Sequence, residues 1–497
     1  GRREDGLPPG PPTIPILGNL HIFPTQSPYL QFTAWARKYG GIISLKIGSE
    51  TIILLSDPRI ARELIDQKSV NTSDRPPSHF VDLITHGKNM GLARYSQFWR
   101  RCRRLAQTMF TKEACVTYLP IQQAEATQLM YDLLNEPEEF VGHFRRYSSS
   151  VLTSILAGMR SPHYTSPSVV DFFDVEEKWI SLLEPGSHTP VDLLPIFKLV
   201  PERWADWKRI CREVRSLQVR VYDRITAVCE RRVSQGLRIG CALESVLDKQ
   251  DQVDEYRGFM RFGGLMEGGA DTTSLFLRSF VLMLVAFPEV QRKAREEIDV
   301  VIGSYRVPSP EDYDNLPYVR AVVKEVLRFR PIAPVGVPHY TSGDETVGGF
   351  LIPKGCTIFI NQWAMFHDPD AYDNPDEFIP ERFLASEFGT KSGADNGGRR
   401  HDLHFGGGRR ICVGMNLANN SLMLNAMNLL WGFEFEEAVD PITKRPIPVD
   451  VNNYSKGIST APNPFKCSIR ARSEAHATSI RREFLAVQPI FERFEKE

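Results

Sequence analysis

The chain has 497 residues, with 60 Lys and Arg against 61 Asp and Glu, which gives a formal net charge of −1. This balance excludes the strong overall positive charge of a dedicated nucleic-acid-binding protein, so we expect no nucleic-acid partner. Hydrophobic residues make up 42% of the chain, which is enough for a large core and too much for a disordered protein. The eight cysteines contain no CxxC pair, which argues against a disulfide framework or a zinc ribbon.

The chain begins with a charged stretch, 1–5, followed by a proline-rich segment, 8–12. Consecutive prolines cannot form a helix and favour extended polyproline geometry. One interpretation is an ordinary lead-in strand; the other is a rigid hinge that followed a membrane anchor, now removed. Composition does not decide between them. The longest apolar run, 280–287, is far shorter than the ~18 to 20 residues that span a bilayer.

Further along the chain, alternating and helical hydrophobic patterns predict the elements. Two short strands are expected within 42–57, small strands and loops within 331–412, and a strand-rich part at 458–469. Helices are expected at about 95–135, 139–159, 200–235, 242–250, 254–302 and 413–430, followed by a charged tail that forms a solvated helix. The sequence therefore predicts one large, mainly α domain with a minor β part. We expect a lead-in at 1–27, a catalytic domain at 28–470 and a tail at 471–497.

The strongest local signal is the loop Phe405-Gly406-Gly407-Gly408-Arg409-Arg410-Ile411-Cys412-Val413-Gly414. Successive glycines let a backbone approach a flat ligand closely. Cys412 lies at the start of the following predicted helix, where free N–H groups stabilise a thiolate. This pattern suits a metal-ligating thiolate beside an anionic cofactor, although a small buried cysteine is the plainer alternative. A zinc site is disfavoured, because no second cysteine is near and His401 and His404 cannot complete four ligands.

A second signal lies inside the long helix predicted over about 254–286, where Gly268 and Gly269 precede Asp271 and Thr272. Each interior glycine costs roughly 1 kcal/mol relative to alanine, so the helix needs a reason to keep them. One reason is close passage over a flat cofactor, with a local widening beside Thr272; the other is tight packing against another helix. A carboxylate next to a hydroxyl can relay protons through water.

Phe405, Gly408, Arg410, Cys412 and Gly414 match the FxxGxRxCxG haem-binding signature of the cytochrome P-450 superfamily. The chain resembles this family over nearly its whole length. The resemblance implies the cytochrome P-450 fold, with haem b (iron protoporphyrin IX) between the long distal helix and the proximal loop. It also implies that Cys412 is the axial iron ligand, and that Asp271 and Thr272 are the acid and the alcohol of the proton-delivering pair.

Three further groups of residues match the family in the right order. Glu325 and Arg328, at i, i+3 on a helix, resemble its ExxR pair, and Pro380-Glu381-Arg382-Phe383 resembles the segment that adds a second arginine to that pair. The resemblance gives this cluster a structural role. It also implies which residues hold the haem propionates: Trp99, Arg103, His339 and, from the loop above, Arg410.

The resemblance is strongest to eukaryotic microsomal members, and the sequence character suggests a fungal one. It implies an N-terminal helix that anchors the enzyme to the cytosolic face of the endoplasmic reticulum membrane, absent from this chain. It also implies electrons from NADPH through a separate diflavin reductase, with cytochrome b5 as a further donor, because the chain has no GxGxxG dinucleotide fingerprint. We expect a monomer. Basic residues expected to favour an acidic donor are Arg100, Arg104, Arg399, Arg400 and Arg409.

The function that follows is a haem-thiolate monooxygenase, which inserts one atom of O₂ into a lipophilic small molecule. Two alternatives stay open: a relative that isomerises or dehydrates its substrate without outside electrons, and a haem sensor or carrier that turns nothing over. A structural protein with an incidental loop is the least consistent with five ordered motifs. By family position, the residues expected to line a mainly apolar pocket are Phe80, Met266, Gly269, Ile332, Val335 and Ile458.

Overall fold

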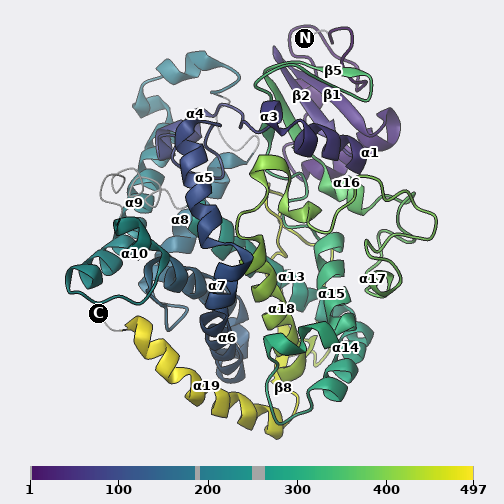
Figure 1. The fold of residues 1–497 in the computed structure, drawn as a ribbon. Helices are drawn as coiled ribbons and strands as arrows, with labels where there is room; N and C mark the ends of the chain where they lie inside the picture. The colour runs from purple at the N-terminus through teal and green to yellow at the C-terminus, as the bar shows by residue number, and fades with distance from the viewer. Residues whose placement is uncertain (1–2, 185–190, 249–263, 496–497) are drawn as a thin grey trace.

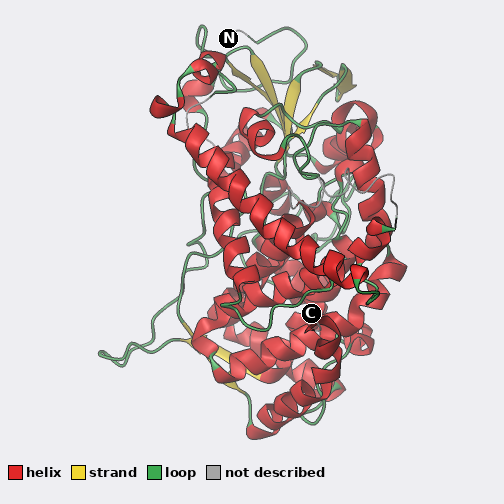
Figure 2. Ribbon diagram, turned by 90° about the vertical axis from the view of Figure 1, so that its left-hand side faces the viewer, coloured by secondary structure: helices red, strands yellow, loops and turns green. Residues whose placement is uncertain are grey.

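The computed structural model describes residues 3–184, 191–248 and 264–495. Most of the chain forms helices, and the strands gather mainly at the end of the molecule that carries the N-terminus (Figures 1 and 2). The long helices are α5 (Gln97–Met109), α6 (Lys112–Asn135), α7 (Phe140–Ala157), α8 (Pro167–Leu183), α9 (Asp206–Ser234), α13 (Thr272–Ala286), α14 (Pro288–Val301), α15 (Pro317–Phe329), α18 (Met415–Gly432) and α19 (Glu474–Glu495).

Shorter helices connect these elements. They are α1 (Pro28–Tyr39), α2 (Pro58–Ala61), α3 (Ser69–Thr72), α4 (His79–Thr85), α10 (Ala242–Leu247), α12 (Gly264–Met266), α16 (Gln362–Phe366) and α17 (Arg382–Ala385). Several helices, both long and short, begin with proline at the first helical position, where its missing N–H costs nothing. Examples are Pro28, Pro167, Pro288 and Pro317. The mainly helical fold class predicted from the sequence is confirmed.

The largest sheet has four strands in the order β1-β2-β6-β3. Its strands are β1 (Ile42–Ile47), β2 (Glu50–Leu55), β3 (His339–Tyr340) and β6 (Cys356–Ile360), while β4 (Glu345–Val347) pairs with β5 (Phe350–Ile352) and β7 (Phe433–Glu437) with β8 (Cys467–Ala471). β1 and β2 form an antiparallel hairpin, and β6 joins β2 in parallel with Ile53 opposite Ile358. The sheet thereby ties the N-terminal part of the chain to residues 339–360.

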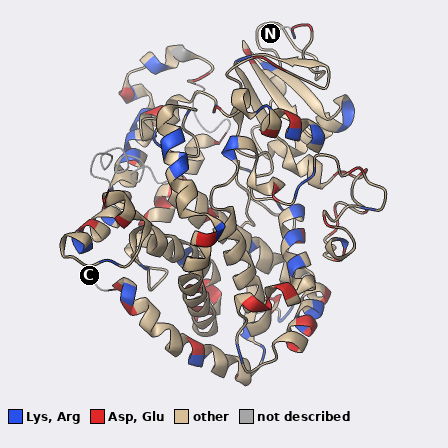
Figure 3. Cartoon of the chain, viewed as in Figure 1, with Lys and Arg blue, Asp and Glu red and all other residues tan. Residues whose placement is uncertain are grey.

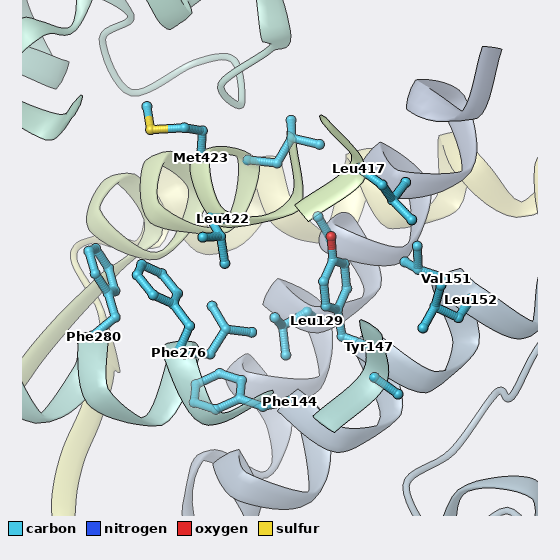
Figure 4. Packing of buried hydrophobic residues seen from close by; sticks show 14 of the residues in the cluster. Leu129, Phe144, Tyr147, Val151, Leu152, Phe276, Phe280, Leu417, Leu422 and Met423 are labelled. Atoms are coloured by element: carbon cyan, nitrogen blue, oxygen red, sulfur yellow. The ribbon is translucent and has the colours of Figure 1, made fainter. Parts of the chain in front are cut away.

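The main core lies where α6, α7, α13 and α18 meet (Figure 4). Phe276 and Phe280 stand one turn apart on α13 and stack with their ring centroids 5.8 Å apart. They point toward Leu422 on α18, and Tyr147 rises from α7 toward the same helix. These side chains are all buried, so α13 and α18 are held side by side at a fixed spacing.

Several boundaries differ from the sequence prediction. The helix expected over 95–135 is broken at Phe110–Thr111, because Thr111 caps a new helix by accepting a hydrogen bond from the Ala114 N–H. The helix expected up to 302 is broken at Phe287, since Pro288 starts α14. Residues 254–263 of that prediction lie outside the described residues. The stretch expected to be strand-rich forms only β8, preceded by a loop.

Both chain ends pack against the body of the protein. Ser44 on β1 donates its N–H to the Pro9 carbonyl, so the proline-rich segment runs along the sheet. The tail expected to be solvated forms α19, which covers α6 (Figure 1) and stacks Phe484 on Tyr131 with centroids 3.9 Å apart. Within the described residues, one helical stretch, Gly264–Ala286, is long and apolar enough to cross a membrane, but 67% of its most apolar window is buried inside the protein.

Candidate active site

A cavity of about 340 Å³ lies between α7, the α12–α13 helix, residues 332–339 and the loop that carries Cys412. It brings together segments that are more than 300 residues apart in the sequence. Site residues from the sequence analysis that line it are Trp99, Arg103, Gly269, Thr272, Ile332, His339, Phe405, Arg410, Cys412 and Gly414. A cavity of this size, mainly apolar and with a few convergent polar groups, is typical of a ligand site.

The loop before α18 holds Cys412 at the cavity wall. The Cys412 N–H donates to the Phe405 carbonyl at 2.9 Å, which closes the loop around its three glycines. Cys412 lies two residues before Gly414, the N-cap of α18, rather than in the helix itself. Burial raises the pKa of the Cys412 thiol, although the Gly414 backbone and Arg103 oppose this. The helix terminus expected to give a free thiolate is therefore outweighed by burial, and a bound metal cation is what deprotonates such a group.

The two glycines of the long helix have different surroundings. A Cβ at Gly268 would meet nothing within 4 Å, because this position faces the cavity. A Cβ at Gly269 would lie 2.6 Å from the Leu152 Cδ1 atom, so this glycine lets α7 pack closely. Tight helix packing therefore explains Gly269, while the cavity leaves room for a ligand to approach the backbone at Gly268.

The widening predicted beside Thr272 is present as a π-helical turn, Glu267–Asp271. The Thr272 hydroxyl donates to the Gly268 carbonyl at 2.7 Å. Such a bond to the carbonyl four residues earlier holds the hydroxyl against the widened turn and leaves its oxygen free to accept a hydrogen bond from the cavity. A π-turn within a helix often marks a functional site.

Asp271 lies on the flank of the helix and is not part of the cavity wall. Burial raises the pKa of its carboxyl to about 6, with Arg145 and Arg278 opposing the rise. Arg145 in turn donates to the Glu177 carboxylate at the surface, at 2.7 Å. Asp271 therefore lies on the side of this helix that is close to a surface ion pair, in a position to exchange protons near neutral pH.

Buried cations gather at one end of the cavity. Burial lowers the pKa of Arg75 to about 9 and that of Arg410 to about 8. Arg410 lies over the Trp99 ring, 3.9 Å from its centroid, and donates to the Ser73 carbonyl at 2.7 Å. Arg103 donates to the Ile411 carbonyl, while its Nε has no partner among the described residues.

His339 also lies at this end, and burial lowers the pKa of its imidazole to about 3. Its neutral ring donates from Nδ1 to the Thr72 carbonyl at 2.8 Å. The neighbouring carboxylate, Asp74, pairs with Arg94 at 2.9 Å. Arg75, Arg103 and Arg410 therefore have little compensating negative charge. Such an arrangement is costly by itself and fits a ligand that carries carboxylates, as haem does.

Glu325 on α15 forms a fully buried ion cluster away from the cavity. Arg328 donates to its two carboxylate oxygens from Nε and Nη2, both at 2.8 Å. Arg382 donates from Nε at 3.2 Å, and the Ile379 N–H completes the shell at 2.8 Å. Arg328 also holds the Phe366 and Pro375 carbonyls. The cluster therefore fastens residues 366–382 to α15.

Four of the six residues expected in the substrate pocket do not line the cavity. Met266 is buried in the core because, at about 100° per residue, it faces away from Gly268. Val335 packs in the cluster next to the sheet, and Phe80 packs on Trp207 with centroids 5.4 Å apart. Ile458 is half-buried outside the cavity wall. The apolar wall is supplied instead by residues such as Val151, Leu152, Leu265, Val337 and Ile360.

Sequence reasoning also missed Arg75 and misjudged part of the surface. Arg75 donates to the Gly91, Val337 and Pro338 carbonyls, and its position in a short extended stretch gave no signal. Arg399, expected at the surface, is buried and donates to the Met365 carbonyl. Arg400 is half-buried and lies 3.6 Å from Asp66.

Comparisons with known proteins agree with this site. A family model described as cytochrome P450 matches residues 8–467. The chain belongs to the cytochrome P450 family. It is 55% identical to a cytochrome P450 monooxygenase of Armillaria gallica over 499 residues, covering 100% of this chain and 95% of that protein. It is 38% identical to monooxygenases of Arthrobotrys oligospora and Aspergillus terreus, covering 99% and 100% of this chain and 94% and 93% of theirs.

Members of this family bind haem, and the residues present fit that group. The thiol of Cys412 and the bare face at Gly268 lie at one cavity, and a cluster of buried cations lies at its end. The chain is a monooxygenase-type oxidoreductase similar to fungal enzymes. Monooxygenases of this family generally require a reductase and a substrate.

Proposed function

We propose that this chain is a haem-thiolate monooxygenase that inserts one atom of O₂ into a lipophilic small molecule. The observation that carries the proposal is the pairing, across one cavity, of Cys412 with the widened turn that ends at Thr272. Haem, when bound, supplies the activation of O₂. Cys412 would hold the iron, and Trp99, Arg103, His339 and Arg410 would surround the propionates. Phe405 and Gly414 would close the loop against the ring.

On the other side of the cavity, Thr272 and Asp271 would control protons. The Thr272 hydroxyl, fixed by the Gly268 carbonyl, can accept and pass on a proton at the cavity wall. Asp271 can supply it, because a carboxyl with a pKa of about 6 is partly protonated near neutral pH. The apolar walls around Leu152, Leu265 and Val337 exclude bulk water and favour a lipophilic substrate.

Electrons would come from NADPH through a separate diflavin reductase, with cytochrome b5 as a second donor. The support is a basic groove on the surface of α5, lined by Gln97, Arg100, Arg104, Gln107 and Arg409 together with Trp99 and Arg103. Lys and Arg colour the visible face of α5 in Figure 3. Arg103 joins this groove to the Cys412 loop through its bond to the Ile411 carbonyl. An acidic patch on the donor would complement this groove.

We further propose that the protein works as a monomer on the cytosolic face of the endoplasmic reticulum membrane. Exposed apolar side chains lie near the N-terminal end of the fold, and Leu193 packs in the same cluster as Phe23 there. Two segments, 14–20 and 194–204, carry exposed apolar side chains: Ile14, Ile16, Leu17, Leu20, Leu194, Ile196, Leu199 and Trp204. Surface of this kind is typical of a membrane or protein contact.

The test combines the purified protein, a eukaryotic diflavin reductase, NADPH and isotopically heavy O₂ with a panel of lipophilic compounds. We expect one heavy oxygen atom in a product, detected by mass spectrometry, and no product without the reductase. Turnover of a substrate with no label and no NADPH consumption would contradict the proposal and indicate an isomerase or dehydratase. A haem protein that is reduced yet turns over no member of a broad panel would indicate a sensor or carrier.

A further inference from the structure

Two further acidic side chains, Glu176 and Glu267, lie near Asp271 where α8 faces the helix that borders the cavity. Glu176 is on α8 and is only 6% exposed. Glu267 begins the π-helical turn that ends beside Thr272. It directly precedes Gly268, whose carbonyl holds the Thr272 hydroxyl. Nothing in the catalytic account above uses either carboxyl.

Hydrogen bonds around this pair are distributed unequally. Asn89 donates from Nδ2 to Glu267 Oε2 at 2.6 Å, and Gln218 donates from Nε2 to Glu267 Oε1 at 3.2 Å. The side chain of Trp179 on α8 also stabilises the charged form of Glu267. The Glu176 carboxyl makes no side-chain hydrogen bond or ion pair with the described residues. Donors thus favour a charge on Glu267 and leave Glu176 as the carboxyl that keeps a proton.

Among the described residues, the charges that act on the pair are all negative. These are Glu176 on α8, and Glu267 and Asp271 on the π-helical turn. From α9 the facing groups are Gln218 and the buried phenol Tyr222. Burial is the main cause that raises the pKa of both glutamates, and for Glu176 the charges of Glu267 and Asp271 add to it. Arg145 and Arg278 act on Asp271 instead.

The Gln218 amide, which is fully buried, also indicates that the cluster lacks a hydrogen. Its Oε1 atom has no hydrogen-bond partner among the described residues. A buried acceptor left without a donor destabilises the fold. Among the described residues, the cluster therefore has an unfilled acceptor on Gln218 and too few hydrogens, a deficit that a bound proton relieves.

Resting on the proposed function, we propose that Glu176 and Glu267 hold a shared proton and deliver it to Asp271 during turnover. The proton passes from the Glu176 carboxyl to the Glu267 carboxylate, and from Glu267 to the Asp271 carboxylate one turn along the same helix face. Asp271 then passes it to the cavity, and one proton from solvent restores the pair. No electron moves in these steps. The exposed Arg145–Glu177 pair gives Asp271 a second route to solvent.

The test uses infrared spectroscopy of the protein labelled with carbon-13 in its glutamate side chains, so that Asp271 does not contribute. We expect a protonated-carboxyl band at neutral pH that carries the isotope shift and that Glu176→Gln or Glu267→Gln removes. The exposed Asp174→Asn on α8 should leave it unchanged. A labelled wild-type protein without such a band would overturn the proposal, even if both variants fail to fold.

Delivery is tested separately by product formed per NADPH and by its pH profile. We expect Glu267→Gln to lower this yield by roughly two- to tenfold, less than the ~10²-fold of a lost general acid because the surface route remains. The yield should also fall less steeply with rising pH than in the wild type. Loss of the band with an unchanged yield and profile would refute delivery. Because the band is measured without turnover, its presence or absence does not depend on whether the protein inserts oxygen.

Discussion

Two carboxylates in this protein, the buried Glu325 and the partly buried Asp271, have opposite surroundings. Glu325 on α15 receives four N–H donors, three of them from Arg328 and Arg382. The Asp271 carboxyl accepts no hydrogen bond from the described residues, and its pKa is raised by burial to about 6 despite Arg145 and Arg278. The difference shows that the fold supplies a buried carboxylate with a full set of hydrogen-bond donors and cations where rigidity is needed, near the segments that support the Cys412 loop. It leaves a carboxylate without such donors at Asp271, where we propose that protons move.

The largest effect is expected from Cys412→Ala, which removes the proposed iron ligand altogether. We expect the reduced protein with carbon monoxide to lose the thiolate-type absorption band and all oxygen insertion, because no other described thiol lines the cavity. Cys467→Ala, at a half-buried thiol away from the cavity, is the matched control. An unchanged carbon monoxide spectrum in Cys412→Ala would rule out this ligand.

At the carboxylate with a full set of donors, Glu325→Gln should be strongly destabilising. It leaves Arg328 and Arg382 buried without their counter-charge, which typically costs about 3–5 kcal/mol. We expect the loss in chemical unfolding and in the yield of folded protein. Glu289→Gln, in an exposed pair with Arg292 on α14, should change neither. Equal stability of Glu325→Gln and Glu289→Gln would show that the cluster is not a structural lock.

Next to the carboxylate without such donors, Thr272→Ala should affect stability little and chemistry more. The lost bond to the Gly268 carbonyl is worth about 1 kcal/mol. We expect hydrogen peroxide released per NADPH to rise and product to fall, since the cavity-side hydroxyl is gone. Thr226→Ala removes a similar bond, to the Tyr222 carbonyl on α9, and should leave the peroxide ratio unchanged. The same ratio in both variants would remove Thr272 from the proton route.

The smallest effect is expected at the α5 groove, outside both regions. Arg100→Gln combined with Arg104→Gln should slow reduction by the reductase several-fold at low salt and weaken its salt dependence. Stopped-flow reduction at two ionic strengths measures this. Replacing Arg62 and Arg203, which lie away from the groove, is the control. A reduction rate insensitive to the groove would place the donor on another face.

Much of this arrangement could be predicted from sequence, because the Cys412 loop and the Thr272 turn are local patterns. The cavity wall could not be, since it depends on which face of each helix turns inward. Met266 and Gly268 are two residues apart, and only Gly268 borders the cavity. Arg75 was missed because its role comes from carbonyls at Gly91 and Val337 that folding brings to it.

Tertiary contacts also determine how the C-terminal tail is packed, which the sequence pattern did not predict. The tail from Arg470 is rich in charge, yet Phe491 is buried beneath the Arg160 guanidinium, 3.6 Å from its ring centroid. Similarly, no sequence pattern indicated a role for Glu176, which is an ordinary acidic residue on an amphipathic helix. Its surroundings depend on α9 and on the π-helical turn, which begin 30 or more residues later in the chain.

The raised pKa of Asp271 lowers the stability of the fold and, in our proposal, serves proton delivery, so Asp271→Asn should change both properties. An aspartate whose pKa rises on folding to about 6 destabilises the protein increasingly as pH rises from about 4 to about 6, and fully above that range. At pH ~7.5, we expect Asp271→Asn to unfold with a free energy up to about 3 kcal/mol higher than wild type, with no gain near pH ~4.

The same variant should form less product and more hydrogen peroxide per NADPH than wild type, while Asp174→Asn on α8 should match wild type in both measurements. A gain in unfolding free energy at high pH together with a loss of product yield is the result that this account predicts. An Asp271→Asn protein that is less stable than wild type at every pH, or that keeps the full product yield, would contradict it.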